Sequence, residues 1–290
     1  MAAPSRTEAF APAKINLFLH VGDKRADGYH ALESLVVFVD EGDRLICETA
    51  DALSLTIEGP FAAGLAGEGD NLVLRAARAL GERAGHKGSA AITLIKNLPV
   101  ASGIGGGSAD AAAALRGLAQ LWGVDGNPVQ LRAIAEGLGS DVPVCLESRA
   151  SWMEGRGEIV TPADGVPSVA MLLVNPGVAV PTAPVFRALE TRTGVGRASR
   201  TGFGTDARGL ADYLATTRND LEAPALQIAP VIGDVLAALR AQPGVLLARM
   251  SGSGATCFGI FVDYAQAKVA ASAMAQAHSG WWVKPARVIA

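Results

Sequence analysis

The sequence predicts an α+β protein with two lobes, and three observations support this prediction. The chain has 290 residues, more than the ~100 to 200 of an ordinary domain. Half of the residues are apolar and 18% are charged, so a sizeable core can be buried. Segments with the period of strands also alternate with segments that have helical spacing. We place an N-terminal lobe at residues 1–163 and a C-terminal lobe at residues 164–290.

The N-terminal lobe begins with strands. Residues 12–21 alternate polar and apolar side chains, which is the period of a half-buried strand, so Lys14 and Asn16 share one face. Further strands are expected at residues 35–38, 44–49, 53–57 and 90–95. Helices are expected at residues 71–84, 109–122 and 128–138. Asp70 is the expected N-cap of the first helix, in which apolar residues recur at helical spacing.

The C-terminal lobe repeats strands and helices in the order of an α+β layer. Strands are expected at residues 169–174, 257–262 and 282–288, and helices at residues 231–239 and 265–277. Residues 191–208 are rich in Gly, Thr, Ser and Arg and contain few large apolar side chains. We therefore expect a mobile surface loop there, with its basic residues in solvent.

Charge and composition exclude several functional classes. The formal charge of −3, from 28 acidic and 25 basic residues, argues against nucleic acid or an anionic membrane as the main partner. The three cysteines and four histidines are scattered, so no zinc site is recognisable. The N-terminus lacks the pattern of a signal peptide, and no apolar run reaches ~18 residues. We expect a cytoplasmic protein with reduced thiols, and the sequence leaves its oligomeric state open, a homodimer included.

A glycine-rich segment, residues 99–110, lies between an expected strand and an expected helix. Four of the five residues from Gly103 to Gly107 are glycine. Backbone without Cβ atoms can adopt positive φ and direct successive N–H groups at one ligand, and a helix N-terminus adds further N–H donors. This predicts an anion site suited to phosphate, with Ser108 able to cap the helix, contact phosphate or bind magnesium. A flexible turn is the alternative.

The segment fails two named nucleotide-binding patterns. No Gly-Lys-Ser/Thr follows the glycines, so it is not a Walker A loop. Ser108 stands where a dinucleotide fingerprint has its third glycine, which argues against an NAD-dependent oxidoreductase. A second glycine cluster, residues 251–256, is weak evidence alone because a tight turn into a strand explains it equally well.

Phosphoryl transfer also needs a group that orients or deprotonates the attacking hydroxyl. Asp141 follows an expected helix in a loop with glycines and a proline, and it could take that role. Read alone, this loop favours a turn or capping aspartate. Lys14 could balance negative charge, or it could be an ordinary lysine at a strand edge. Tyr29 and His30 could bind a planar ligand, although a packing role is the simpler interpretation of the tyrosine.

Three segments together, residues 12–17, 99–112 and 251–256, resemble the three ordered motifs of the GHMP kinase superfamily. Residues 25–30 and 139–143, with a segment at 181–186, are similar to its branch that phosphorylates a cytidine-diphosphate-linked polyol for isoprenoid precursors. The resemblance covers nearly the whole chain. It implies an N-terminal ATP-binding and catalytic domain, a GHMP-type C-terminal domain, and an active site in the cleft between the lobes. It also implies ATP as co-substrate with Mg²⁺, and a small nucleotide-linked substrate.

The resemblance further implies a role for individual residues. Lys14 and Asp141 would be the catalytic pair, with Asp141 as the base. The implied ATP-binding residues are Asn71, Leu72, Pro99, Val100, Ala101, Ser102, Gly103, Ile104, Gly105, Gly106, Gly107, Ser108 and Ala109. The implied substrate-binding residues are Asn16, Tyr29, His30, Lys96, Thr182, Phe186, Gly252 and Gly254. Tyr29 and Phe186 would cover the two faces of cytosine. Ala109 replaces a usual serine, so Ser108 is the one hydroxyl there for magnesium.

Two alternatives remain at this stage. A different GHMP kinase, acting on homoserine or a mevalonate compound, would share the phosphate loop but would not need Tyr29, His30 and Phe186 for a nucleobase. A non-catalytic nucleotide-binding or sensor protein would also keep the loop. The presence of both Lys14 and Asp141 in matching contexts argues against this second alternative.

Overall fold

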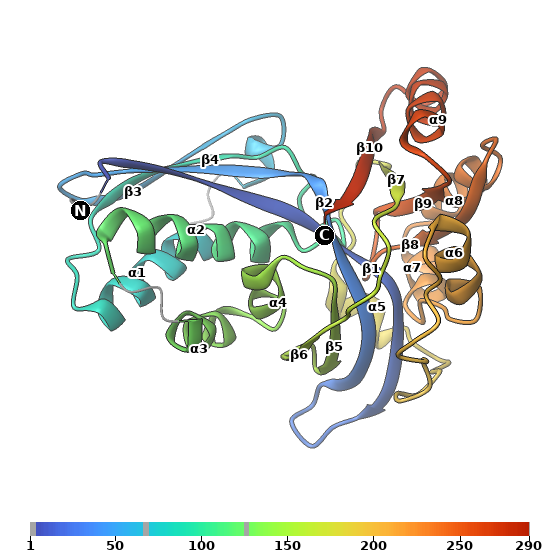
Figure 1. The fold of residues 1–290 in the computed structure, drawn as a ribbon, viewed down its shortest axis with the longest axis horizontal. Helices are drawn as coiled ribbons and strands as arrows, with labels where there is room; N and C mark the ends of the chain where they lie inside the picture. Colours follow the sequence, from blue (N-terminus) through green and yellow to red (C-terminus); the bar gives the residue numbers. More distant parts are fainter. Residues whose placement is uncertain (1–3, 66–69, 125–127, 290) are drawn as a thin grey trace. The chain divides into compact units, whose positions relative to one another are not determined.

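The computed structural model describes residues 4–65, 70–124 and 128–289 of the chain (Figure 1). The chain divides into two compact units. The first contains residues 1–13, 42–100 and 105–148, and the second contains residues 14–41, 101–104 and 149–290. Two long strands, β1 (Arg6–Lys24) and β2 (His30–Glu48), have residues in both units. The predicted domain boundary at residue 163 is a division of the sequence into functional domains and stays a prediction.

The first unit packs helices on a sheet. Strand β4 (Ala90–Ile95) pairs in parallel with β3 (Leu53–Glu58) and antiparallel with residues 44–48 of β2. The remaining elements are η1 (Ala62–Leu65), α1 (Leu72–Ala84), α2 (Gly106–Trp122), α3 (Pro128–Leu138) and α4 (Val142–Glu147). Figure 1 shows α1, α2 and α3 together on one face of these strands.

The alanine-rich sequence of α2 explains its place in the core of this unit. Most of its alanines are fully buried, and short side chains allow a helix to approach its neighbours closely. Helix α1 begins after Asn71, whose side chain accepts a hydrogen bond of 2.9 Å from the backbone N–H of Val73. The predicted N-cap, Asp70, was therefore wrong by one residue.

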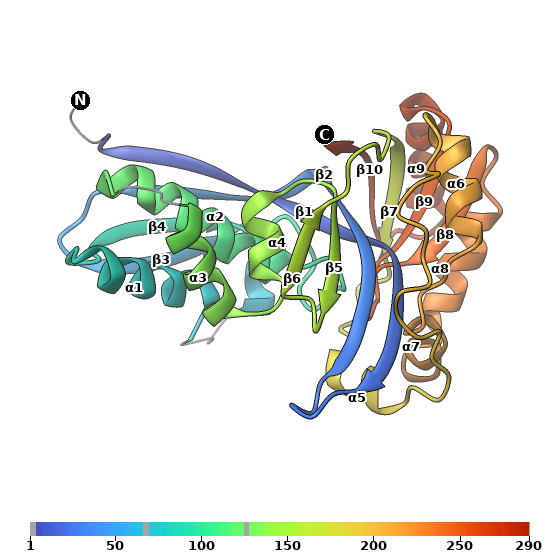
Figure 2. The ribbon, with the colours of Figure 1, turned by 60° about the horizontal axis from the view of Figure 1, so that its bottom comes forward.

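The second unit contains an antiparallel sheet in the order β10, β7, β9, β8. The bounds are Ala170–Asn175 for β7, Val245–Met250 for β8, Cys257–Phe261 for β9 and Trp282–Ile289 for β10. Helices α8 (Val231–Arg240) and α9 (Tyr264–Ala277) contribute side chains to its apolar core. Figure 2 shows both helices beside the sheet. This order is that of a split β-α-β arrangement, so the predicted α+β layer is confirmed.

Shorter elements complete the second unit. They are β5 (Ser151–Gly155), β6 (Ile159–Pro162), α5 (Thr182–Arg187), α6 (Ala207–Ala215) and α7 (Glu222–Ile228). Strand β5 pairs with residues 32–36 of β2, next to the turn that connects β1 with β2. None of the helices in the described part of the chain is long and apolar enough to cross a membrane.

Strand β2 differs most from its prediction. Residues 35–38 and 44–49 were predicted as two separate strands. They form one strand in the structure. Gly42 is required by packing rather than by a turn, because a Cβ there would collide with the carbonyl oxygen of Ala11.

Candidate active site

The phosphate loop, residues 99–109, has the backbone conformation that its glycines permit. Gly103 and Gly105 have φ of 76° and 65°, in the left-handed region that side chains disfavour. Gly105 is the N-cap of α2, so Gly106, Gly107 and Ser108 form its first turn. The first N–H groups of a helix have no partner within it, and they favour an anion. The predicted loop-to-helix arrangement is therefore present.

Residues 101–104 pack closely against the second glycine cluster. A Cβ on Gly103 would lie 2.5 Å from the carbonyl oxygen of Ser251 and 2.8 Å from the backbone nitrogen of Gly254. The Ser251 hydroxyl donates to the Gly103 carbonyl at 3.0 Å, and the Thr256 N–H donates to the Ser102 carbonyl at 3.0 Å. The structure thus joins two glycine clusters that are about 150 residues apart in sequence.

Strand β1 connects to both clusters through the two polar residues singled out on it. The backbone N–H of Lys14 donates to the carbonyl of Ile104 at 3.0 Å, and that of Asn16 donates to the Ser251 hydroxyl at 3.1 Å. The Asn16 amide also donates to the Ser34 hydroxyl at 2.8 Å. Lys14 and Asn16 are each only 4% exposed. A buried lysine in such a place is more unusual than a lysine at a strand edge.

Asp141 occupies the N-cap position of α4, with φ −90° and ψ −13°. Its side chain makes no capping hydrogen bond to this helix, which weakens the interpretation as a capping aspartate. The backbone holds the position: the Val142 N–H donates to the Gly139 carbonyl, and the Cys145 N–H donates to the Asp141 carbonyl, both at 3.2 Å. Asp141 belongs to the first unit and Lys14 to the second.

A buried group that we call the lysine cluster, Asp43, Lys96 and Asp110, supports the phosphate loop. The Lys96 ammonium donates to the Oδ2 atoms of Asp43 and of Asp110, the latter at 2.7 Å. Asp43 Oδ1 also accepts from the backbone N–H groups of Asn97, at 2.6 Å, and Leu98, at 2.8 Å. The cluster therefore ties the chain that enters the loop to the helix that leaves it.

Burial dominates the electrostatics of the lysine cluster. It raises the pKa of Asp110 to about 7, with the neighbouring Asp43 carboxylate acting in the same direction and the Lys96 ammonium opposing both. Burial alone would lower the pKa of Lys96, but the two carboxylates raise it, so the lysine stays charged. A Cβ on Gly106 would lie 3.1 Å from Lys96 Nζ, which places this cation beside the first turn of α2.

Lys96 therefore differs from its predicted environment. The resemblance implied a substrate-binding lysine, yet Lys96 is 2% exposed and its ammonium contacts two protein carboxylates. Its direct contact with substrate stays a prediction. In the structure, Lys96 supports the phosphate loop by binding Asp43 and Asp110.

The residues expected at a nucleobase lie around the turn between β1 and β2. The imidazole of His30 stacks on the ring of Phe186, with centroids 5.8 Å apart and planes 16° apart, and its Nδ1 lies 3.1 Å from the carbonyl oxygen of Gly22. Tyr29 is 57% exposed, with the Arg156 guanidinium 5.3 Å from its ring centroid. The structure thus joins His30 with Phe186, and the arrangement of Tyr29 and Phe186 on two faces of cytosine stays a prediction.

Three more predicted residues have defined contacts. The Thr182 hydroxyl lies 2.9 Å from that of Ser253, in the second glycine cluster. Leu72 lies beside the phosphate loop, with its Cδ1 3.7 Å from where a Cβ of Gly107 would be. Asn71 caps α1 directly before it, and its position follows from that hydrogen bond.

Sequence reasoning missed several polar residues that hold these parts in place. The Asn219 amide donates to the carbonyls of Met250 and Gly252, both at 2.8 Å, and so fixes the second glycine cluster. Asp110 lies inside the glycine-rich segment, but nothing marked it as buried. Asp43 and Asn219 had no local signal, because their partners are distant in sequence.

Comparison with known proteins agrees with this geometry. Residues 71–149 match the family described as GHMP kinases N terminal domain, and residues 199–280 match that described as GHMP kinases C terminal. A relative from Cereibacter sphaeroides named 4-diphosphocytidyl-2-C-methyl-D-erythritol kinase is 56% identical over 283 residues, 97% of this chain and 99% of its own.

Solved structures show the same fold. A crystal structure of 4-(cytidine 5'-diphospho)-2C-methyl-D-erythritol kinase has a TM-score of 0.77 at 35% identity, covering 98% of this chain and 100% of its own. Homoserine kinase from Cytophaga hutchinsonii has a TM-score of 0.73 at 20% identity, covering 99% and 96%, which shows the fold alone. The predicted two-lobed α+β fold of the GHMP type is thereby confirmed. The chain belongs to the GHMP kinase family.

Proposed function

We propose that this protein phosphorylates a hydroxyl of 4-diphosphocytidyl-2-C-methyl-D-erythritol with ATP, giving the 2-phosphate, in the non-mevalonate route to isoprenoid precursors. The observation that carries the proposal is the likeness to relatives with that name, at 56% and 52% identity over 97% and 96% of the chain. Such likeness extends over the phosphate loop and over the segments around His30 and Phe186. We therefore infer that the protein is a kinase of a small nucleotide-linked alcohol.

The reaction requires one bond to form and one to break. The acceptor hydroxyl oxygen attacks the γ-phosphorus of ATP, the bond to the β–γ bridging oxygen breaks, and ADP leaves. We assign Asp141 to accept the hydroxyl proton, because it lies in the segment, residues 139–143, through which the chain resembles kinases of this kind. We assign Lys14 to supply positive charge for the carboxylate and the transferred group, because it is a buried lysine beside the phosphate loop.

The phosphate loop would hold ATP through backbone N–H groups and the N-terminus of α2, with Asn71 and Leu72 nearer the adenine. No group of three His, Cys, Asp or Glu side chains that could hold a metal ion occurs among the described residues. Mg²⁺ usually keeps several waters and binds substrate phosphates, so it would be bound mainly by ATP phosphates and water, and Ser108 would supply the one hydroxyl in the first turn of α2. Bound Mg²⁺ would neutralise charge on the transferred phosphoryl group.

The contacts of His30 favour cytosine over uracil. A carbonyl oxygen such as that of Gly22 can only accept, so the facing Nδ1 carries the proton and Nε2 of a neutral imidazole is an acceptor. Cytosine offers an exocyclic amine, which donates, whereas uracil has a carbonyl oxygen at that position. His30 would accept a hydrogen bond from this amine while Tyr29 and Phe186 stack on the base. The rest of the substrate-binding site would be lined by Asn16, Lys96, Thr182, Gly252 and Gly254.

The proposed enzyme has two functional domains. The two family matches, residues 71–149 and 199–280, lie on opposite sides of a boundary at residue 163, which supports an ATP-binding domain before it and a GHMP-type domain after it. We place the enzyme in the cytoplasm, where its thiols stay reduced. Light scattering would distinguish a monomer from a homodimer.

The test is a substrate panel. ADP release is measured with purified enzyme, ATP and Mg²⁺, using 4-diphosphocytidyl-2-C-methyl-D-erythritol, its uridyl analogue, homoserine and mevalonate in parallel. We expect turnover of the cytidyl compound, with the uridyl analogue impaired at least about tenfold by the lost hydrogen bond. Turnover of homoserine or mevalonate alone would overturn the proposal and favour the other GHMP kinase activities.

A further inference from the structure

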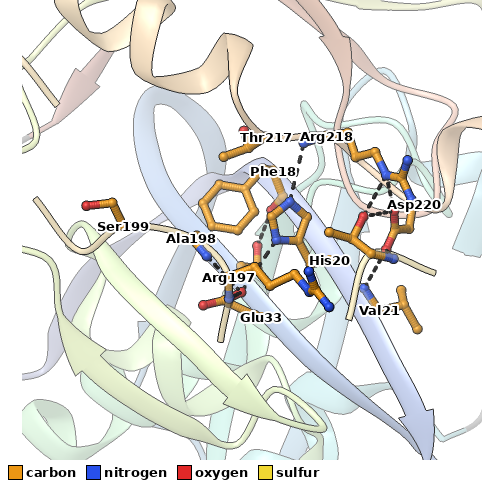
Figure 3. A network of polar contacts seen from close by, with 12 residues as sticks. Phe18, His20, Val21, Glu33, Arg197, Ala198, Ser199, Thr217, Arg218 and Asp220 are labelled. Atoms are coloured by element: carbon orange, nitrogen blue, oxygen red, sulfur yellow. Dashed lines mark hydrogen bonds and ion pairs between the residues drawn. The ribbon is translucent and has the colours of Figure 1, made fainter. Parts of the chain in front are cut away.

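A short segment, residues 193–198, is anchored to the strands that carry the proposed nucleobase site. Sequence analysis predicted a mobile surface loop over residues 191–208, and residues 188–206 indeed contain no helix or strand. The predicted mobility is not what the contacts of residues 193–198 indicate. Their backbone is held at both ends by two buried carboxylates, Glu33 and Asp220, which we call the loop anchor (Figure 3).

Asp220 holds the first end of the segment. Its Oδ2 accepts from the backbone N–H groups of Val21 and Thr193, both at 2.8 Å. Its Oδ1 accepts from the Thr193 hydroxyl at 2.6 Å and from Arg218 Nε at 2.7 Å. The Val21 carbonyl in turn accepts from the N–H of Gly194 at 3.0 Å. Both oxygens of Asp220 are thus occupied by donors, and strand β1 is bonded to the segment directly.

Glu33 holds the second end. Its Oε2 accepts from the backbone N–H groups of Arg197, at 3.1 Å, and Ala198, at 3.4 Å, and it lies 3.4 Å from His20 Nδ1. The other nitrogen of His20 lies 3.4 Å from the N–H of Arg218, so a neutral ring satisfies both contacts. Burial lowers the pKa of His20, which agrees with a neutral imidazole that donates to Glu33.

The segment lies against Gly22, the residue that orients His30. A Cβ on Gly22 would be 3.1 Å from Val195 Cγ1 and 3.3 Å from the Cβ of Ala31, so Val195 covers Gly22. The carbonyl oxygen of Gly22 is the partner of His30 Nδ1. Any shift of residues 193–198 would therefore move the backbone that fixes the imidazole.

We propose that Glu33 and Asp220 are positioning residues for recognition of the nucleobase, acting through residues 193–198 and Gly22 on His30. This inference rests on the proposed function, because it assumes that His30 contacts a cytosine. Neither carboxylate touches the base. Their effect should appear in the affinity for the cytidyl ligand and should leave ATP binding unchanged.

The test is Asp220→Asn, since an amide nitrogen must then face at least one of the donors that surround the carboxylate. Binding of cytidine 5'-diphosphate and of a non-hydrolysable ATP analogue is measured by calorimetry, with KM for each substrate and kcat alongside. We expect about tenfold weaker binding of cytidine 5'-diphosphate, a matching rise in the KM of the cytidyl substrate and little change for ATP. Asp212→Asn, on an exposed residue of α6, removes the same charge and should behave like wild type.

A second pair of variants avoids a buried charge. Gly22→Ala should weaken the binding of cytidine 5'-diphosphate a few-fold, because the added Cβ pushes Val195 away. The double variant Gly22→Ala with Val195→Ala should recover part of the lost affinity. Equal loss of both ligands in Asp220→Asn, or no rescue in the double variant, would overturn the inference. Wild-type protein that fails to bind cytidine 5'-diphosphate would instead refute the proposed function. Wild-type affinity in Asp220→Asn would refute only the positioning role.

Discussion

The lysine cluster and the loop anchor are two buried groups of carboxylates that solve the same problem differently. In the lysine cluster, Asp43 and Asp110 share the ammonium of Lys96. In the loop anchor, Glu33 and Asp220 are satisfied largely by backbone N–H groups of residues in the chain segments they join. A buried charge needs a counter-charge or several hydrogen bonds, and the two groups combine these in different proportions. The shared ammonium dominates in the lysine cluster, although Asp43 also accepts from two backbone N–H groups. Backbone donors dominate in the loop anchor, although Arg218 also donates to Asp220.

The difference indicates how each half of the proposed site is kept in shape. A shared ammonium can hold two carboxylates from different elements, but burial, together with the nearby Asp43 carboxylate, still raises the pKa of Asp110 to about 7. Backbone donors lower the energy of a carboxylate without bringing a second negative charge close to it. Burial alone would raise the pKa of Asp220, yet its hydrogen bonds hold it below the ordinary value.

The largest expected effect concerns neither group. Asp141→Asn should reduce kcat by about 10² to 10⁴-fold because it removes the proton acceptor, while ATP and cytidine 5'-diphosphate bind as in wild type. Steady-state kinetics measure kcat, and calorimetry on the same samples measures the binding of the two nucleotides. Asp51→Asn, on an exposed residue, is the matched control. Activity within a few-fold of wild type would remove Asp141 from the chemical step.

The next effect breaks the lysine cluster. Lys96→Met leaves two buried carboxylates without their cation and should cost about 3 to 5 kcal/mol in the free energy of unfolding, measured by urea denaturation. Adding Asp110→Asn should recover part of this loss, since one buried charge disappears. Lys87→Met, on an exposed lysine, should change stability little. A Lys96→Met protein as stable as wild type would show that the cluster is not an ion-paired support.

The pKa values of Asp110 and Asp220 are shifted in opposite directions, so the two carboxyl groups affect stability over different pH ranges. The folded pKa of Asp110 is raised, so its contribution to stability is lost as pH rises from about 3.8 to about 7. The folded pKa of Asp220 is lowered, so its contribution is present above the ordinary value and is lost as pH falls through the folded value. Urea denaturation between pH 4 and 8 should show a weaker decline with rising pH in Asp110→Asn than in wild type. An unchanged slope would contradict the raised pKa.

The smallest expected effect lies at the exposed edge of the nucleobase site. Tyr29→Ala should raise the KM of the cytidyl substrate by roughly fivefold, because one stacking contact is worth about 1 kcal/mol. Tyr29→Phe keeps the ring and should retain wild-type KM. Measurements at saturating ATP separate this effect from nucleotide binding. An unchanged KM in Tyr29→Ala would contradict the stacking role.

Local sequence patterns predicted the fold well wherever periodicity and turn chemistry were strong. The helices α1, α3, α8 and α9 and strands β4 and β7 fall within one or two residues of their predicted bounds. Short elements such as α4, β5 and α7 were missed, because a few residues carry too little periodic signal. Strand β2 was split, because Gly42 resembles a turn but is required by packing against Ala11.

The site was predictable to the extent that its chemistry lies in contiguous motifs. The glycines of the phosphate loop follow from local backbone requirements, although α2 begins at Gly106 and not at the predicted residue 109. The supporting residues do not: Asp43 lies 53 residues from Lys96, and Asp220 lies 199 residues from Val21. Only the three-dimensional arrangement shows that such aspartates are buried and bonded.

The central claim is that each buried group supports one ligand, and calorimetry on Asp43→Asn, in the lysine cluster, and Asp220→Asn, in the loop anchor, tests it most directly. Both variants are titrated with the ATP analogue and with cytidine 5'-diphosphate. We predict that Asp43→Asn loses affinity for the ATP analogue and keeps that for cytidine 5'-diphosphate, whereas Asp220→Asn shows the reverse. If both folded variants lose both ligands to the same extent, the two groups stabilise the protein as a whole and the claim is contradicted.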